Sequence, residues 1–125
     1  MQFDKAGIIL LTECYEDCVA FYRDVLGLAL LFRLDRVGSI LSCFDLGGAY
    51  LMVEPGRPGS GRSGGAARSP IKLRFNVEDV AASASELKAK GVEVALNQHD
   101  WGTTAEFADP DGNRCALRSV QGFGI

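Results

Sequence analysis

Three features that would narrow the function are missing from this sequence: a long apolar run, an excess of basic residues and cysteine pairs with C-x-x-C spacing. No apolar run approaches a membrane-spanning helix, and residues 1–12 lack the charged start and the cleavage site of a signal peptide. The formal net charge of −3 argues against nucleic acid or an anionic membrane as the main partner. We therefore expect no nucleic acid and no membrane among the partners.

The four cysteines lack the C-x-x-C spacing of zinc sites and redox motifs. Without an export signal they are interpreted as reduced thiols, which predicts a cytoplasmic protein. Cys14 and Cys18 are spaced to share a helix face, either as a redox or metal pair or, as we favour, as two thiols in the core. With 47% hydrophobic and 23% charged residues, the composition is that of an ordinary globular protein.

Residues 55–70, PGRPGSGRSGGAARSP, are rich in glycine, proline, serine and arginine and contain no acidic residue. Such a segment is typical of a flexible linker. We expect it to join two modules, at about 1–54 and 71–125, within a single domain that spans residues 1–125.

The two modules show the same order of elements. In the first, a strand at 7–11 precedes a helix that ends at Gly27, and strands follow at 28–32, 39–44 and 49–53. The apolar face of this helix comprises Cys18, Phe21, Tyr22, Val25 and Leu26. The second module has a strand at 72–77, a helix with Val80, Ala84 and Leu87 that ends at Gly91, and strands at 92–96, 104–108 and 114–118.

Matching turns precede the last strand of each module. DLGG at 45–48 and DPDG at 109–112 lie 64 residues apart, as do Gly27 and Gly91. The repeat predicts an α+β fold of two tandem βαβββ modules. Because each helix covers one face of its sheet, the other faces are free to line a shared cleft suited to a small molecule.

Two motifs, FYRDVLGL at 21–28 and FADPDGN at 107–113, resemble those of the vicinal oxygen chelate superfamily. This superfamily includes glyoxalase I, extradiol dioxygenases, and fosfomycin and bleomycin resistance proteins, and the chain is most similar to its bleomycin-resistance-like branch. The resemblance covers essentially the whole chain. It implies a curved mixed sheet around a cleft that a second chain often completes, whereas the motifs are not specific for one function.

Members of the superfamily with metal chemistry place His, Glu or Gln at one cleft-facing position on the first and last strand of each half. Carried over by the resemblance, these positions are Gly7, Met52, Lys72 and Ala116. None is a usual ligand of a divalent metal, so we expect no metal and no other cofactor. A displaced metal site that uses Glu54, His99 or Glu106 is the alternative.

Alternation along the strands assigns further residues to the cleft face. One wall is apolar to aromatic with a single acid, and the other is mainly basic: Gly7, Ile9, Leu11, Tyr50, Met52 and Glu54, then Lys72, Arg74, Asn76, Arg114, Ala116 and Arg118. Leu73, Phe75, Val77, Cys115 and Leu117 form the opposite, apolar face of the second module, which is suited to packing under its helix.

Lys72 and Arg74 occupy consecutive cleft-side positions and suit a carboxylate, phosphate or sulfate. Alternatively, the basic residues form a solvated edge or ion pairs with Glu54 or Glu106. In the loop at 97–104, Trp101 is placed to stack on a flat ligand. His99, in the same loop, is either part of this site or an ordinary surface histidine, and the second interpretation is favoured for this residue taken alone. The expected ligand-binding residues are Lys72, Arg74, Tyr50, Met52, Trp101, His99, Arg118 and Glu54, and no catalytic residue is assigned.

These patterns predict a metal-independent protein that holds a small anionic or aromatic compound in its cleft. The alternatives are a divalent-metal-dependent lyase, isomerase or dioxygenase with displaced ligands, and a metal-free acid–base enzyme that uses His99 or Glu54. A purely structural dimerisation module is disfavoured by the polar cleft face. We also expect a homodimer, because a symmetric partner can cover open sheet edges and apolar surface.

Overall fold

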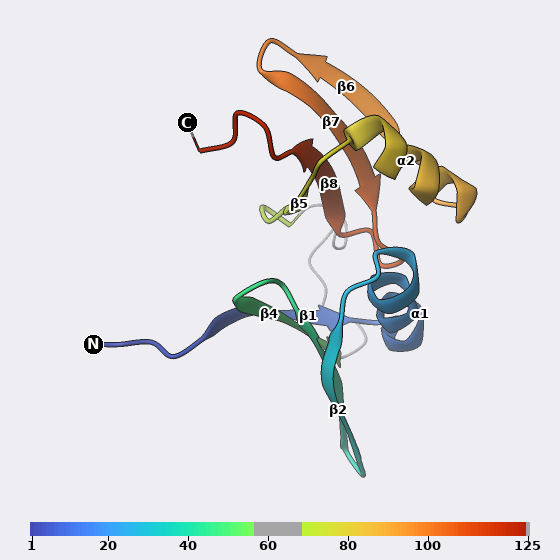
Figure 1. Cartoon of the computed structure of the whole chain (residues 1–125). Helices are drawn as coiled ribbons and strands as arrows, with labels where there is room; N and C mark the ends of the chain where they lie inside the picture. Colours follow the sequence, from blue (N-terminus) through green and yellow to red (C-terminus); the bar gives the residue numbers. More distant parts are fainter. Residues whose placement is uncertain (57–68, 125) are drawn as a thin grey trace. The chain divides into compact units, whose positions relative to one another are not determined.

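The computed structural model describes residues 1–56 and 69–124. The chain divides into two compact units, Met1–Gly61 and Arg62–Ile125, and each unit has its own four-stranded mixed sheet (Figure 1). This confirms the α+β fold of two βαβββ modules. The central part of the predicted linker, residues 57–68, lies outside the described residues.

The first unit has the strand order β1-β4-β3-β2, in which β1 and β4 run parallel and the other neighbours are antiparallel. Its elements are β1 (Ala6–Thr12), α1 (Tyr15–Ala20), η1 (Phe21–Val25), β2 (Leu30–Arg36), β3 (Ser39–Asp45) and β4 (Ala49–Pro55). Strand β4 therefore includes Pro55, where the linker was expected to begin. The side chains of Phe44, Leu51 and Val53 are fully buried on the sheet face that packs against the helix.

The first helix differs from the regular helix that was predicted. After Ala20 it widens into the π-helical turn η1, in which the N–H of Leu26 donates to the carbonyl oxygen of Phe21 at 3.0 Å. The neighbours Phe21 and Tyr22 are both buried, as predicted for the apolar face, and their rings meet edge to face with centroids 5.3 Å apart.

The end of this helix is as predicted. Gly27 adopts φ +72°, a left-handed conformation that costs glycine little, and the N–H of Leu28 donates to the carbonyl oxygen of Tyr22 at 2.9 Å. Of the predicted apolar face, Cys18, Phe21 and Tyr22 are buried, whereas Val25 and Leu26, at the end of η1, are only half-buried.

The second unit repeats the topology with the order β5-β8-β7-β6, and β5 and β8 run parallel. Its elements are β5 (Leu73–Val77), α2 (Val80–Ala89), β6 (Ala95–His99), β7 (Gly102–Ala108) and β8 (Arg114–Ser119). Helix α2 covers one face of this sheet (Figure 1), and it buries Val80, Ala84 and Leu87 as predicted. On the same face of the sheet, Leu73, Cys115 and Leu117 are buried and Phe75 and Val77 half-buried.

The DPDG turn joins the antiparallel strands β7 and β8, as predicted. Asp109 is only 5% exposed, and its carboxylate accepts from the backbone N–H groups of Asp111 and Asn113 at 2.9 Å and from the Asn113 side chain at 2.8 Å. A carboxylate that accepts several local N–H groups fixes the turn, which explains the aspartate at its start.

Two strand predictions were wrong in their boundaries. Strand β2 runs to Arg36 instead of ending at residue 32, because Gly38 at φ +77° permits a tight turn into β3 and the pairing Arg36↔Ser39. Strand β6 was expected at 92–96 but spans Ala95–His99, and the expected loop at 97–104 is mostly a hairpin with His99 opposite Gly102. Cross-strand pairing outweighs the apolar pattern at both places.

No helix among the described residues is long and apolar enough to cross a membrane.

Candidate functional site

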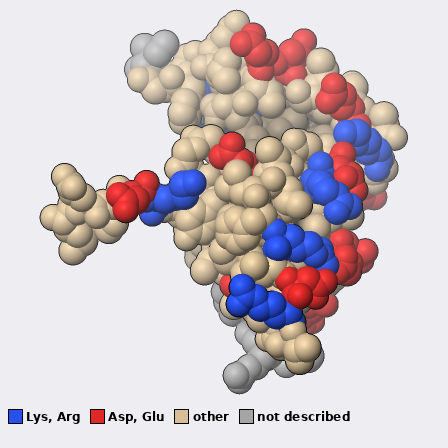
Figure 2. Space-filling model, turned by 60° about the horizontal axis from the view of Figure 1, so that its bottom comes forward, with Lys and Arg blue, Asp and Glu red and all other residues tan. Residues whose placement is uncertain are grey.

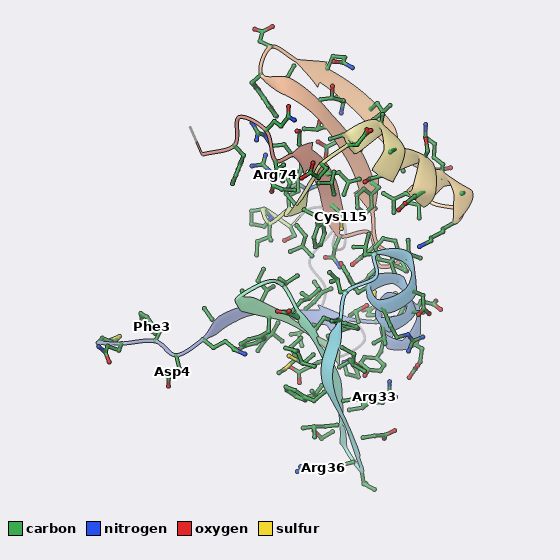
Figure 3. All side chains as sticks on the ribbon, in the orientation of Figure 1. Phe3, Asp4, Arg33, Arg36, Arg74 and Cys115 are labelled. Atoms are coloured by element: carbon green, nitrogen blue, oxygen red, sulfur yellow. The ribbon has the colours of Figure 1, made fainter. Side chains whose placement is uncertain are left out.

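Basic residues from two strands of the second unit share the sheet face that points away from α2. In the ladder, Arg74 lies opposite Ala116, and Arg118 lies opposite Asn76 on one side and Thr104 on the other. Arg74 is exposed and Cys115 on the neighbouring strand β8 is buried (both labelled in Figure 3), as expected for residues on opposite faces of one sheet. The predicted alternation is therefore confirmed for β5 and β8.

Arg118 and Arg74 contact aromatic rings on this face. The guanidinium carbon of Arg118 lies 4.8 Å from the centroid of the Trp101 ring and 5.1 Å from that of Phe123. The guanidinium carbon of Arg74 lies 5.7 Å from the same Phe123 ring. His99 stacks on Trp101 with centroids 4.4 Å apart and planes 2° from parallel. We call these five residues, Arg74, His99, Trp101, Arg118 and Phe123, the Arg–aromatic cluster.

The sequence analysis did not identify Phe123. Its position depends on the turn after β8, in which the N–H of Val120 donates to the carbonyl oxygen of Val77 at 3.0 Å and so anchors the turn beside β5. The available signal was local: Phe123 stands between Gly122 and Gly124, which adopt φ +74° and +81° and permit the sharp turn. An aromatic residue between two glycines near a chain end is too common to indicate a binding role by itself.

His99 also contacts the sheet through its side chain. Its Nε2 lies 3.0 Å from the Thr104 hydroxyl, on the strand opposite. Together with the Trp101 stack, this contact holds the imidazole in one orientation at the end of the hairpin. His99 and Trp101 therefore lie together with Arg118, and their role in ligand binding stays a prediction.

Lys72, in contrast, is engaged in an ion pair. Its Nζ lies 3.1 Å from Oε2 of Glu106, and the two side chains are 39% and 31% exposed. Because β8 lies between β5 and β7, and Glu106 pairs with Ala116, this ion pair spans β8 beside Ala116. The alternative of an ion pair with Glu106 is therefore confirmed for Lys72. Among the described residues, neither Arg74 nor Arg118 forms an ion pair.

The other three predicted residues, Tyr50, Met52 and Glu54, lie on β4 of the first unit. The parallel register places them beside Gly7, Ile9 and Leu11 of β1. Ile9 and Leu11 are 55% and 63% exposed, so this face is apolar and accessible around a single carboxylate. That the two faces line one cleft stays a prediction.

The Tyr50 ring lies against the backbone of Gly7. A Cβ atom added at Gly7 would overlap three carbons at the base of that ring. Glycine itself has no side-chain donor atom. While Tyr50 keeps this orientation, the Gly7 position also has no room for a larger side chain.

The residues at the four positions that the resemblance assigns to a metal do not fit a divalent cation. Gly7 and Ala116 have no donor atom, Met52 has only a soft thioether, and Lys72 carries an ammonium group already paired with Glu106. No group of three or more His, Cys, Asp or Glu side chains suited to a metal occurs in 1–56 or 69–124. In contrast to these four positions, the Arg–aromatic cluster presents two guanidinium groups beside aromatic rings.

Some of the charges elsewhere on the surface form ion pairs. On the side of the molecule drawn in Figure 2, Lys and Arg side chains lie next to Asp and Glu side chains. Arg23 pairs with Asp24 at 2.8 Å, and this hydrogen-bonded carboxylate raises the pKa of the guanidinium. Arg33 lies 3.5 Å from Glu16. Arg74 and Arg118, like the exposed Arg36, form no ion pair within the described residues, and they differ from Arg36 in their contacts with aromatic rings.

Comparisons with known proteins agree with the fold and with the two motifs. Residues 6–117 match the model of the Glyoxalase/Bleomycin resistance protein/Dioxygenase superfamily. The uncharacterized protein YraH of Bacillus subtilis is 32% identical over 117 residues, which cover 85% of this chain and 90% of YraH.

Solved structures with a similar fold differ in what their names describe. SMU.1112c is 25% identical, with a TM-score of 0.77 and coverage of 94% of this chain and 98% of that one. TnmS3, an antibiotic binding protein from Streptomyces sp. CB03234, is 22% identical, with a TM-score of 0.75 and coverage of 95% and 98%. A lactoylglutathione lyase from Agrobacterium tumefaciens is 23% identical, with a TM-score of 0.71 and coverage of 96% of both chains. At these identities, the last two show the fold alone.

Proposed function

Because the chain belongs to the glyoxalase/bleomycin resistance protein/dioxygenase superfamily, we propose that it binds a small anionic or aromatic compound without a metal ion. The Arg–aromatic cluster is the proposed centre of that site. TnmS3, whose fold is similar, is described as an antibiotic binding protein, which supports a small-molecule ligand by analogy of fold.

The observation that carries the proposal is the pair of guanidinium groups without carboxylate partners among the described residues. Arg118 contacts two rings, at 4.8 and 5.1 Å, and Arg74 contacts one of them at 5.7 Å. These contacts restrict the side chains while their N–H groups keep the capacity to bind an oxyanion in a bidentate manner. A ligand that joins a carboxylate or phosphate to a flat ring would bind the guanidinium groups through its anion and stack its ring on the aromatic side chains of the cluster.

The proposal that no metal ion is needed rests on the donor atoms available at the four positions that the resemblance assigns to a metal. A catalytic metal of this fold requires three or four N or O donors, and Gly7, Met52, Lys72 and Ala116 supply none that is free. The displaced alternative is weakened by the engagement of Glu106 with the Lys72 ammonium at 3.1 Å, since a divalent cation at Glu106 would have to displace that ammonium. No observation on the described residues favours the metal-dependent lyase, isomerase or dioxygenase.

The proposal is tested by calorimetric titration with matched probes. We use 2-naphthoate, its uncharged amide, and inorganic phosphate, on the intact protein and on Arg118→Gln. Naphthoate should bind more tightly than the amide or phosphate, and Arg118→Gln should weaken naphthoate binding by about 1–3 kcal/mol, the range for a lost charge-assisted hydrogen bond.

A matched control separates a local effect from a change in overall charge. Arg36 lies at the far end of β2 (Figure 3), is exposed and forms no ion pair within the described residues, so Arg36→Gln removes the same charge elsewhere. Equal loss of naphthoate affinity in both variants, or unchanged affinity in Arg118→Gln, would show that the Arg–aromatic cluster is not the binding site.

A further inference from the structure

Two thiols and a hydroxyl meet at the junction between β1 and α1, in a cluster that the proposed function does not use. The sulfur atoms of Cys14 and Cys18 are 3.9 Å apart. The Thr12 hydroxyl oxygen lies 3.5 Å from the Cys14 sulfur and 3.4 Å from the Cys18 sulfur. It also accepts from the backbone N–H of Cys14 at 3.0 Å.

The two thiols differ in accessibility. Cys14 is partly exposed, whereas Cys18 is 0% exposed and Thr12 only 1% exposed. Cys14 precedes the helix with φ −125° and ψ 68°, so it lies outside the regular helical path, while Cys18 lies within α1. One sulfur can therefore meet a reagent from solvent, and the other can be reached only from its neighbour.

We propose that Cys14 and Cys18 form a site of reversible oxidation by hydroperoxides. In the first step the Cys14 thiolate attacks the outer oxygen of hydrogen peroxide, the O–O bond breaks, and Cys14 becomes a sulfenic acid as hydroxide leaves. In the second step the Cys18 sulfur attacks the Cys14 sulfur and displaces the sulfenic oxygen as water. Two thiols and one peroxide give one disulfide and two waters, and a thiol reductant reverses the change.

The geometry suits this sequence of steps. The sulfur atoms must approach by about 2 Å to reach disulfide bonding distance. Cys14 can supply that movement because its backbone is not helical and its carbonyl oxygen holds only the first turn, accepting from the Cys18 N–H at 3.0 Å. The Cys18 side chain lies within α1 and stays in place.

Thr12 acts as a positioning residue. Its oxygen already accepts from the Cys14 N–H, so its single proton is available to one of the two sulfurs. A hydroxyl that donates to sulfur favours the thiolate, which is the reactive form. Three acidic residues, Glu13, Glu16 and Asp17, adjoin the cysteines in the sequence, and the test therefore uses excess peroxide.

The remaining two cysteines provide an internal comparison. Cys43 on β3 is 2% exposed, and Cys115 on β8 is 0% exposed. Burial also raises the pKa of the Cys43 thiol, which suppresses its thiolate. Because both thiols are buried from solvent, both should remain reduced when Cys14 and Cys18 are oxidised.

The experiment treats the folded protein with excess hydrogen peroxide, blocks the remaining thiols after denaturation, and maps them by mass spectrometry. Trypsin leaves both cysteines in one peptide, residues 6–23, which should be lighter by two hydrogen atoms and carry no blocking group. Cleavage after Glu16, between the two cysteines, should leave the halves joined until a reductant is added. Reduced Cys14 and Cys18, or a Cys14 sulfinic acid without disulfide, would overturn the proposal.

Three variants divide the proposed roles. In Cys18→Ser, Cys14 should accumulate as a sulfenic acid that dimedone traps, because its resolving partner is gone. In Cys14→Ser, Cys18 should stay reduced. Thr12→Val should slow oxidation several-fold relative to Cys43→Ala, the control. If Cys14→Ser leaves the rate of peroxide consumption unchanged, or if Thr12→Val oxidises as fast as Cys43→Ala, the assigned roles are wrong.

Discussion

Replacing Gly7 by alanine should destabilise the protein, although the residue is exposed on a strand where alanine is normally the better choice. Gly7 has no positive φ, so alanine adopts its backbone conformation without strain. On that basis alone the change should stabilise by about 0.4–1 kcal/mol, because the unfolded chain loses freedom. The contact with the Tyr50 ring makes the net change in the free energy of unfolding destabilising instead.

The added Cβ would overlap the Tyr50 ring at its attachment carbon and along one edge. Movement at the tip of the ring cannot relieve this contact, so the side chain must change its χ1 rotamer or β1 must shift against β4. Overpacking of this kind typically costs about 1–3 kcal/mol. With a urea dependence of about 1–3 kcal/mol per M, the unfolding midpoint should fall by roughly 1 M.

The assay is urea unfolding of a double-mutant cycle over Gly7→Ala and Tyr50→Ala. In the Tyr50→Ala background the penalty should vanish and Gly7→Ala should become neutral or stabilising. Gly56→Ala is the matched control, because a Cβ there would meet its nearest atoms at 3.5 Å, an ordinary contact, with no positive φ. A Gly7→Ala protein as stable as the Gly56→Ala protein would refute the packing of Tyr50 on Gly7, and with it the claim that the Gly7 position has no room for a larger side chain.

Three other outcomes are expected. Lys72→Ala should change the free energy of unfolding, measured by urea unfolding, by no more than about 1 kcal/mol, because the side chains of its ion pair with Glu106 are 39% and 31% exposed. Burial raises the pKa of Cys43, so its contribution to stability is complete below the ordinary pKa of a thiol and declines as the pH rises above it. Cys43→Ala should therefore flatten the alkaline loss of stability in urea unfolding. Sedimentation equilibrium should give a homodimer, since Ile9 and Leu11 are 55% and 63% exposed, and a mass of 13.4 kDa at micromolar concentration would contradict this.

The parts of the fold set by local chemistry could be predicted from the sequence. Gly27 and Gly91 end the two helices at positive φ, and Asp109 fixes the DPDG turn through hydrogen bonds within four residues. The strand ends near Arg36 and His99 could not be predicted, because pairing with the next strand extends them beyond their apolar pattern.

The same distinction between local pattern and strand pairing applies to the residues of the candidate site. A period of two along β5 and β8 suffices to place Arg74 and Arg118 on one face. The contact of Phe123 with both arginines depends on a turn closed by the Val120–Val77 hydrogen bond, which no local pattern indicates. For Lys72, the sequence offered two possible acidic partners, and only the sheet order brings Glu106 within 3.1 Å.

The central claim is that the chain binds its ligand through the Arg–aromatic cluster and without a metal ion. The most direct test is the dissociation constant of 2-naphthoate before and after exhaustive chelation, dialysis and elemental analysis. The account predicts the same dissociation constant in both preparations, and no gain on adding Zn²⁺, Mn²⁺, Fe²⁺ or Ni²⁺. Loss of binding on chelation, with recovery when one of these ions is returned, would contradict it and identify a displaced metal site instead.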